Sequence, residues 1–198
     1  QFRQNLLFKN PFVDSYKPTQ LDVLLSHMIN PKIKAFGFDV FDTLLCRPFL
    51  RPIDLFDLME KDAEDIIGKK SINFSRTRIA AEYLARHGKV EVKLDEIYDV
   101  LTLEQRFLKA RETALNLFRL AKQEGKKVFI ASDMYLSTQT VAGFLENNGY
   151  CLDGVEVYVS CDRGAVKHDG SLFRYLAREI GVNPTETVFI GDNVKSDV

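Results

Sequence analysis

Four polar residues of this sequence have types and positions that suit chemistry on a charged ligand. They are, in chain order, Asp39, Ser132, Lys167 and Asp192. Three of the four stand at or just after a short apolar run that is typical of a buried strand. A carboxylate released at the carboxyl end of such a strand lies where open α/β sheets bind their ligands. The spacing therefore predicts that two carboxylates and a hydroxyl meet at one edge of a sheet.

The elements that would position these residues alternate between strand and helix. The expected strands cover 35–40, 127–131, 155–159 and 187–190, and the expected helices between the later strands cover 137–148 and 171–180. This alternation predicts an α/β fold, a Rossmann-like doubly wound parallel sheet with helices on both faces. Because the crossovers of such a sheet are right-handed, the carboxyl ends of all its strands lie along one edge.

The segment between the first two expected strands is far longer than a crossover requires. Residues 52–124 carry apolar stripes at helical spacing and no convincing strand, and the last helix is expected to run from Thr102 to Gly125. We therefore expect an all-helical cap over 47–110, inserted into a discontinuous core of 34–46 and 111–198. A cap above the strand ends can exclude water and select the substrate.

Residues 1–33 are expected to form an N-terminal arm. Thr19 is a candidate cap for a short apolar helix that Pro31 would end. The arm is interpreted as packing along its own domain, with a docking surface for a partner or a neighbouring domain as the alternative. The chain begins at Gln1 rather than Met and stops at Val198, so we expect a fragment of a longer protein.

Composition and charge exclude several classes of function. The net charge is −1, from 27 basic and 28 acidic residues that are evenly mixed, which disfavours nucleic acid and anionic membranes as partners. No apolar run is long enough to span a membrane. The three cysteines lack C-x-x-C spacing and are interpreted as reduced thiols of a cytoplasmic protein.

The four motifs together resemble those of the haloacid dehalogenase (HAD) superfamily, from about residue 34 to the end of the chain. The best match is 167–193, where a lysine, a helix, a strand and Gly191-Asp192-Asn193 follow one another. The segments 38–48 and 132–136 are similar to one subgroup, predicted hydrolases encoded with bacterial surface-polysaccharide glycosyltransferases. This narrower resemblance implies a role in polysaccharide biosynthesis and a glycosyltransferase as a partner.

The resemblance implies a role for each polar residue at the strand ends. Asp39 would attack phosphorus and form an aspartyl-phosphate. Asp39, Asp192 and the main-chain carbonyl of Phe41 would hold Mg²⁺, an ion that favours such oxygen ligands. Ser132 would hydrogen-bond a phosphoryl oxygen, and Lys167 would neutralise charge on the nucleophile and the phosphoryl group.

Further residues are candidates for contact with the substrate or for support of the site. The expected substrate contacts are Ser132, Thr43, Arg47 and Asp133, and the expected supporting residues are Asn193 and Asp197. Additional candidates from the cap and its hinges are Arg76, Arg78 and Tyr135. An arginine fork suits the recognition of phosphate or carboxylate. The alternative for each of these arginines is a solvated side chain, and for the tyrosine a packing role.

The sequence departs from the HAD pattern at Phe41. Phosphatases of the family carry an aspartate there, which protonates the leaving group and then deprotonates the attacking water. Phenylalanine cannot transfer a proton, and general acid–base catalysis contributes about 10²–10⁴-fold. Hydrolysis should therefore be slow unless Asp42 or a cap residue substitutes, or the leaving group needs no acid.

Three hypotheses for the function follow. The first is a Mg²⁺-dependent phosphatase or phosphotransferase that acts on a small phosphorylated metabolite, with a sugar phosphate as the guess. The second is a weak or inactive HAD module that binds a phosphorylated ligand or a glycosyltransferase. The third is another nucleophilic reaction such as dehalogenation, which the retained Gly191-Asp192-Asn193 motif disfavours.

Overall fold

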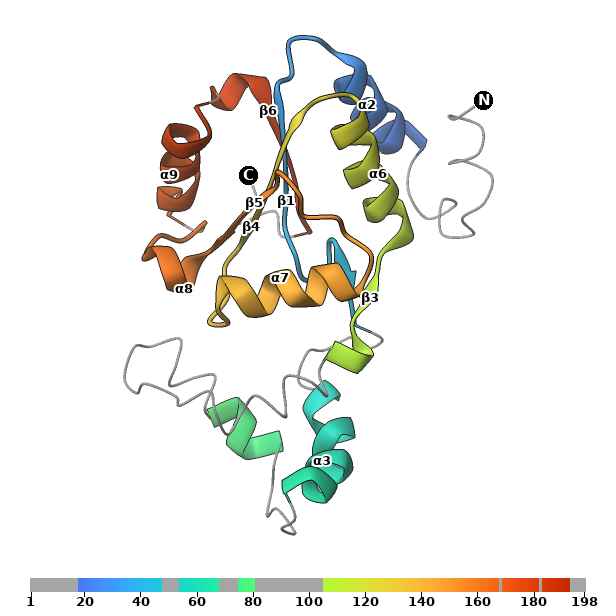
Figure 1. Cartoon of the computed structure of the whole chain (residues 1–198), viewed down its shortest axis with the longest axis vertical. Coiled ribbons are helices and arrows are strands. Elements are labelled where there is room, and N and C mark those ends of the chain that lie inside the picture. Colours follow the sequence, from blue (N-terminus) through green and yellow to red (C-terminus); the bar gives the residue numbers. More distant parts are fainter. Residues whose placement is uncertain are drawn as a thin grey trace.

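A parallel sheet of four strands forms the centre of the protein (Figure 1). The computed structural model describes residues 18–47, 54–67, 75–80, 105–167, 169–181 and 183–192. The sheet strands are β1 (Ala35–Phe38), β4 (Lys127–Ser132), β5 (Glu156–Val159) and β6 (Thr187–Ile190). They lie side by side in the order β5-β4-β1-β6, and every pair is parallel. The predicted parallel α/β sheet is confirmed.

Helices cover both faces of this sheet (Figure 1). They are α2 (Pro18–Ile29), α6 (Glu112–Gln123), α7 (Thr138–Asn147) and α9 (Ser171–Ile180), with the short α8 (Ser160–Arg163) and the 3₁₀ turn η3 (Pro184–Glu186) in the connections. The alternation of side chains along a strand decides which helix each residue meets. Phe36 and Phe38 of β1 share a core cluster with α2, α6 and α7, whereas Ala35 belongs to the cluster beneath α9.

Gly37 allows the aromatic side chains of the two neighbouring strands to approach across β1. A Cβ atom at this position would lie 2.3 Å from the Phe129 ring and 2.5 Å from the Phe189 ring. Because these distances are far below van der Waals contact, no larger residue fits without displacing both rings. Their centroids are 6.1 Å apart, so Gly37 permits the aromatic packing on the α9 face of the sheet.

Strand β1 ends two residues earlier than the sequence predicts, at Phe38 rather than residue 40. The main-chain N–H groups of Leu44 and Leu45 both donate to the Val40 carbonyl at 2.8 Å, which closes a tight turn directly after Asp39. This turn takes residues 40–45 out of the sheet. It also places Asp39 at the strand end, where its N–H donates to the Ile190 carbonyl of β6 at 2.9 Å.

Two short strands lie in regions where the sequence predicts none. β2 (Leu45–Cys46) and β3 (Lys109–Ala110) pair in the antiparallel direction. The expectation of no strand over 52–124 is therefore wrong at 109–110, and the expected helix from Thr102 to Gly125 is interrupted there. Helical structure covers 105–107 and resumes as α6 at Glu112. The pairing brings the two ends of the segment 47–108 together.

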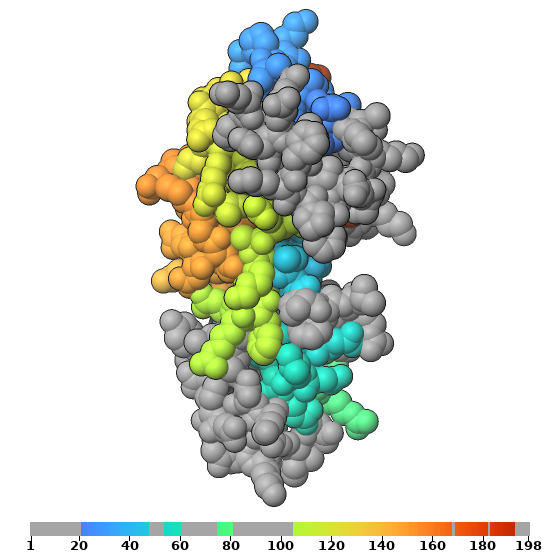
Figure 2. Space-filling model, turned by 90° about the vertical axis from the view of Figure 1, so that its right-hand side faces the viewer, coloured from blue at the N-terminus to red at the C-terminus, as the bar shows by residue number. Residues whose placement is uncertain are grey.

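Within that segment the structure describes α3 (Asp54–Ile67) and a helical stretch at 75–80. Figures 1 and 2 show these two elements at one end of the molecule, with α2 at the opposite end. Leu55, Phe56 and Met59 of α3 are buried, which agrees with the apolar stripe in its sequence.

The N-terminal helix α2 begins at Pro18, one residue before the predicted cap at Thr19, and ends before Pro31 as predicted. Leu21, Leu25 and Met28 are buried in the same cluster as β1. Residues 1–17 of the expected arm lie outside the described residues. The three cysteines are free thiols. In the part of the chain that the structure describes, no helix has the length and apolar character to span a membrane.

Candidate active site

The site lies where the order of the strands reverses. From β1 the chain adds β4 and β5 on one side and then returns to place β6 on the other side of β1. Ligands of open α/β sheets bind at the carboxyl ends of the strands at such a switch point. Asp39 follows β1, and Gly191 and Asp192 follow the adjacent β6, with Phe38 in register with Ile190. Two of the predicted carboxylates therefore come from neighbouring strand ends.

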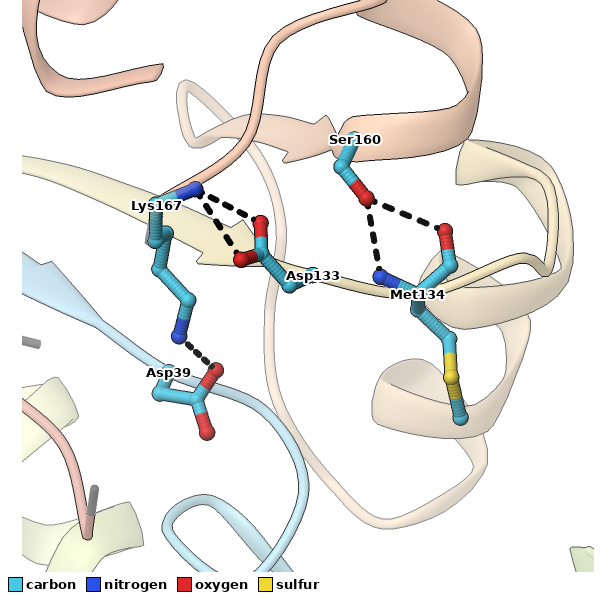
Figure 3. A network of polar contacts seen from close by, with 5 residues as sticks. All are labelled: Asp39, Asp133, Met134, Ser160 and Lys167. Atoms are coloured by element: carbon cyan, nitrogen blue, oxygen red, sulfur yellow. Dashed lines mark hydrogen bonds and ion pairs between the residues drawn. The ribbon is translucent and has the colours of Figure 1, made fainter. Parts of the chain in front are cut away.

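A buried ion pair joins Asp39 to Lys167. The ammonium nitrogen Nζ of Lys167 lies 2.6 Å from Oδ1 of Asp39, and the two side chains are 4% and 10% exposed. The same ammonium lies 5.5 Å from the centroid of the Phe189 ring, within cation–π range. Figure 3 shows the side chain of Lys167, which lies between α8 and α9 in the sequence, extending to Asp39. Residues 128 positions apart thus meet at one point, as the motif order predicts.

The Lys167 main chain is held by a second carboxylate. Both oxygens of Asp133 accept the main-chain N–H of Lys167, at 2.8 and 3.0 Å (Figure 3). Asp133 follows Ser132, the last residue of β4, whose side chain is buried. The next residue, Met134, donates its N–H to Oγ of Ser160 at 3.0 Å. The predicted Ser132 therefore ends β4 directly before a loop that is held by contacts with Lys167 and Ser160.

The turn after Asp39 is held by side chains from distant parts of the chain. Asp42 adopts a left-handed backbone conformation with φ of 59°, and its carbonyl accepts a hydrogen bond from Nη2 of Arg111 at 2.8 Å. The Tyr150 hydroxyl donates to the Leu44 carbonyl at 2.7 Å. Burial raises the pKa of Tyr150 well above its usual value, which keeps this hydroxyl protonated as a donor.

Thr43 is the buried polar residue of this turn. Its side chain is enclosed, yet its Oγ1 has no hydrogen-bond partner among the described residues. A buried hydroxyl without a partner is unusual in a native protein and calls for an explanation such as a missing ligand. The role of Thr43 beside a bound phosphate stays a prediction.

The donor set suits Mg²⁺. The predicted ligands are one buried carboxylate, the exposed Asp192 and the main-chain carbonyl of Phe41. In the described ranges, no three His, Cys, Asp or Glu side chains cluster as a protein-only metal site would require. Mg²⁺ is usually held by one or two carboxylates, with water and substrate phosphate completing its octahedron. These residues therefore fit Mg²⁺ better than a metal that needs nitrogen or sulfur ligands.

Two arginines that were candidates for substrate contact have partners within the protein. Nη2 of Arg47 lies 2.6 Å from Oδ2 of Asp42, and its guanidinium carbon lies 5.3 Å from the centroid of the Phe41 ring. Arg78 is buried, with its guanidinium carbon 5.0 Å and 5.3 Å from the rings of Phe56 and Tyr135.

Nη2 of Arg78 also donates to the Tyr135 hydroxyl at 2.7 Å. This contact joins the helical stretch 75–80 to the loop that follows Ser132. Arg76, by contrast, is exposed. The predicted supporting residues Asn193 and Asp197 lie outside the described residues.

Sequence reasoning missed Arg111, Tyr150 and Ser160. Each acts through a side chain on a main-chain group far away in the sequence, 69 residues away for Arg111 and 106 for Tyr150. No local motif marks such contacts.

The comparisons with known proteins agree with this geometry. A family model described as haloacid dehalogenase-like hydrolase matches residues 33–198. A HAD family enzyme of Bacteroides thetaiotaomicron, solved as an aspartate-to-alanine mutant with magnesium and inorganic phosphate, superposes with a TM-score of 0.56. It shares 15% sequence identity, and the match covers 83% of this chain and 87% of that one.

Two further structures show the same fold. A predicted phosphatase from Clostridium acetobutylicum has a TM-score of 0.53 at 13% identity, covering 83% of this chain and 78% of its own. The YfnB protein of Bacillus subtilis, named as a HAD hydrolase and bound to magnesium, has a TM-score of 0.51 at 18% identity, with coverage of 83% and 82%. No curated protein matches the sequence.

Proposed function

Because the chain belongs to the haloacid dehalogenase-like hydrolase family, we propose that it is a Mg²⁺-dependent phosphatase or phosphotransferase that acts through an aspartyl-phosphate on Asp39. The substrate class is a small phosphorylated metabolite, with a sugar phosphate as the first candidate. The observation that carries the proposal is the buried Asp39–Lys167 ion pair at the switch point of the sheet.

In the proposed reaction, the Asp39 carboxylate attacks phosphorus while the bond to the leaving oxygen breaks. Lys167 holds the carboxylate in place and offsets the negative charge that gathers on the phosphoryl oxygens. Ser132 and Thr43 donate hydrogen bonds to those oxygens. Asp39, Asp192 and the Phe41 carbonyl would hold Mg²⁺, whose positive charge lets an anionic nucleophile approach an anionic phosphate.

Phe41 is the reason to expect slow hydrolysis of the aspartyl-phosphate, the second half of the reaction. Its side chain is 9% exposed and has no group that could activate water. The nearest carboxylate in the sequence, that of Asp42, is engaged by Arg47 at 2.6 Å. Hydrolysis of the aspartyl-phosphate is therefore proposed to be slow, which favours either transfer to another acceptor or a long-lived phosphoenzyme.

The segment 47–110 is proposed to act as a cap that selects the substrate. Two contacts support this assignment. The β2–β3 pair joins the ends of the segment, and Arg78 hydrogen-bonds Tyr135 on the loop after Ser132. A hinge motion at the β2–β3 pair would move Arg78 toward or away from the site.

A second candidate function is a phosphate-binding module with little turnover, which Phe41 specifically favours. The resemblance to hydrolases encoded with surface-polysaccharide glycosyltransferases names the proposed partner and a cytoplasmic role in polysaccharide biosynthesis. Under this alternative the Asp39–Lys167 ion pair contributes to binding of the phosphorylated ligand, and no aspartyl-phosphate forms.

The test is phosphate release from a panel of sugar phosphates and an aryl phosphate, with and without Mg²⁺. The matched blank is Asp39→Asn, and Asp22→Asn on the exposed side of α2 controls for the loss of an aspartate elsewhere. Release that requires Mg²⁺, persists in Asp22→Asn and disappears in Asp39→Asn supports the phosphatase. No release above the blank, together with retained binding of inorganic phosphate, supports the binding module.

A further inference from the structure

Lys167 lies in a loop whose main chain is held on one side by the first turn of α9, because the Val166 carbonyl accepts the N–H of Leu172 at 3.0 Å and the hydroxyl of Ser171 at 3.2 Å. The loop runs from the end of α8 to the start of α9, and left-handed glycines flank it at Gly164 and Gly170. Within the loop, the Lys167 carbonyl accepts the N–H of Gly170 at 2.8 Å. The Lys167 N–H instead donates to a side chain from another strand end, the carboxylate of Asp133.

A lysine ammonium sits at the end of four methylene groups. Its position therefore depends on where the main chain of the lysine itself is held. Asp133 holds the other side of the same peptide group, because both carboxylate oxygens accept the Lys167 N–H at 2.8 and 3.0 Å. Hydrogen bonds to a charged acceptor are about twice as strong as neutral ones. Figure 3 shows the result, with Lys167 held by Asp133 at its main chain and by Asp39 at its ammonium.

Asp133 is itself anchored through the next residue. The Met134 N–H donates to Oγ of Ser160 at 3.0 Å, and the Ser160 hydroxyl donates back to the Met134 carbonyl at 3.2 Å. Ser160 follows the last residue of β5. The ends of β4 and β5 are thus joined directly beside the residue that holds Lys167.

We infer that Asp133 is a positioning residue that acts through Lys167, rather than a substrate contact as its sequence position suggests. Its carboxylate fixes the Lys167 main chain so that the ammonium reaches Asp39, and Ser160 holds the loop from which Asp133 projects. This inference rests on the proposed function only where it concerns activity, because the contacts themselves can be tested without substrate.

The activity test uses Asp133→Ala, which removes the acceptor of the Lys167 N–H. We expect kcat/KM to fall by about 10- to 100-fold, mainly through kcat, because a misplaced catalytic group loses rate rather than affinity. Asp133→Asn keeps one acceptor oxygen and should recover most of the activity. A rise in KM with kcat unchanged would contradict the inference and assign Asp133 to the substrate.

The matched control is Asp162→Ala. Asp162 also uses an exposed carboxylate to accept a main-chain N–H, that of Thr138 at 2.6 Å, but it does not touch Lys167. Its removal should leave kcat/KM within about twofold of the unsubstituted protein. In a Lys167→Met background, Asp133→Ala should cause no further loss, because residues that act through one group are not additive. Additive losses would overturn the inference.

A readout without activity separates failure of this inference from failure of the proposed function. The exchange rate of the Lys167 amide hydrogen can be followed by NMR in the unsubstituted protein and in the same variants. Exchange should accelerate about tenfold or more in Asp133→Ala and remain unchanged in Asp162→Ala. Unchanged exchange in Asp133→Ala would refute the positioning role, whatever the protein's activity.

Discussion

Replacement of Lys167 by methionine tests the energetic importance of the buried ion pair. The substitution keeps the unbranched stem of the side chain and removes the ammonium that lies 2.6 Å from Asp39. Because the two side chains are only 4% and 10% exposed, water cannot replace the lost partner effectively. Removal of one member of a buried pair costs about 3–5 kcal/mol, so we expect the free energy of unfolding to fall by that amount.

A second ion pair of the same length provides the control. Oδ2 of Asp42 also lies 2.6 Å from its partner Arg47, but the Asp42 side chain is 42% exposed. Asp42→Asn should therefore cost about 1 kcal/mol or less, because solvent screens an exposed pair. Asparagine also tolerates the left-handed backbone conformation at this position.

The assay is urea denaturation followed by circular dichroism, since the sequence contains no tryptophan. A deficit of Lys167→Met no larger than that of Asp42→Asn would refute the reasoning.

Three further predictions concern the turn after Asp39 and one thiol. Phe41→Asp should raise phosphate release by about 10²–10⁴-fold by supplying an acid and base, and an unchanged rate would mean that another group does this already. Tyr150→Phe should lower the unfolding free energy by about 0.5–1.5 kcal/mol, because the Leu44 carbonyl loses one of its two donors; no change in urea midpoint would contradict this. Burial and the neighbouring Asp162 raise the pKa of Cys161 from 9.0 to about 11, so its alkylation in a pH series should reach half its maximum near that value rather than near 9.0.

The sequence was sufficient to predict the sheet and the residues at its strand ends. Asp39, Ser132 and Asp192 follow apolar runs whose length and flanking residues are typical of buried parallel strands. The parallel arrangement then requires that these ends share one edge, as the structure shows. Lys167 was predicted from its place in the motif order, and its contact with Asp39 agrees.

The remaining features depend on tertiary contacts that leave no periodic pattern. β2 and β3 have two residues each, too few for alternation to be read, and their pairing depends on the turn after Asp39. The positive φ of Asp42 is favoured by contacts from Arg47 and Arg111 rather than by a glycine. Arg78 was a candidate for phosphate recognition, but whether an arginine faces solvent or packs between aromatic rings depends on which elements meet around it.

The central claim, a phosphoryl group carried on Asp39, can be tested by trapping it. The protein is incubated with Mg²⁺ and a phosphorylated substrate, quenched in acid and digested, and the peptide that contains Asp39 is analysed by mass spectrometry. Since Phe41 is expected to slow hydrolysis, the aspartyl-phosphate should accumulate on that peptide, disappear after hydroxylamine treatment and be absent from Asp39→Asn. A substrate that turns over without phosphorylating this peptide, or one that labels Asp39→Asn equally, would contradict the account.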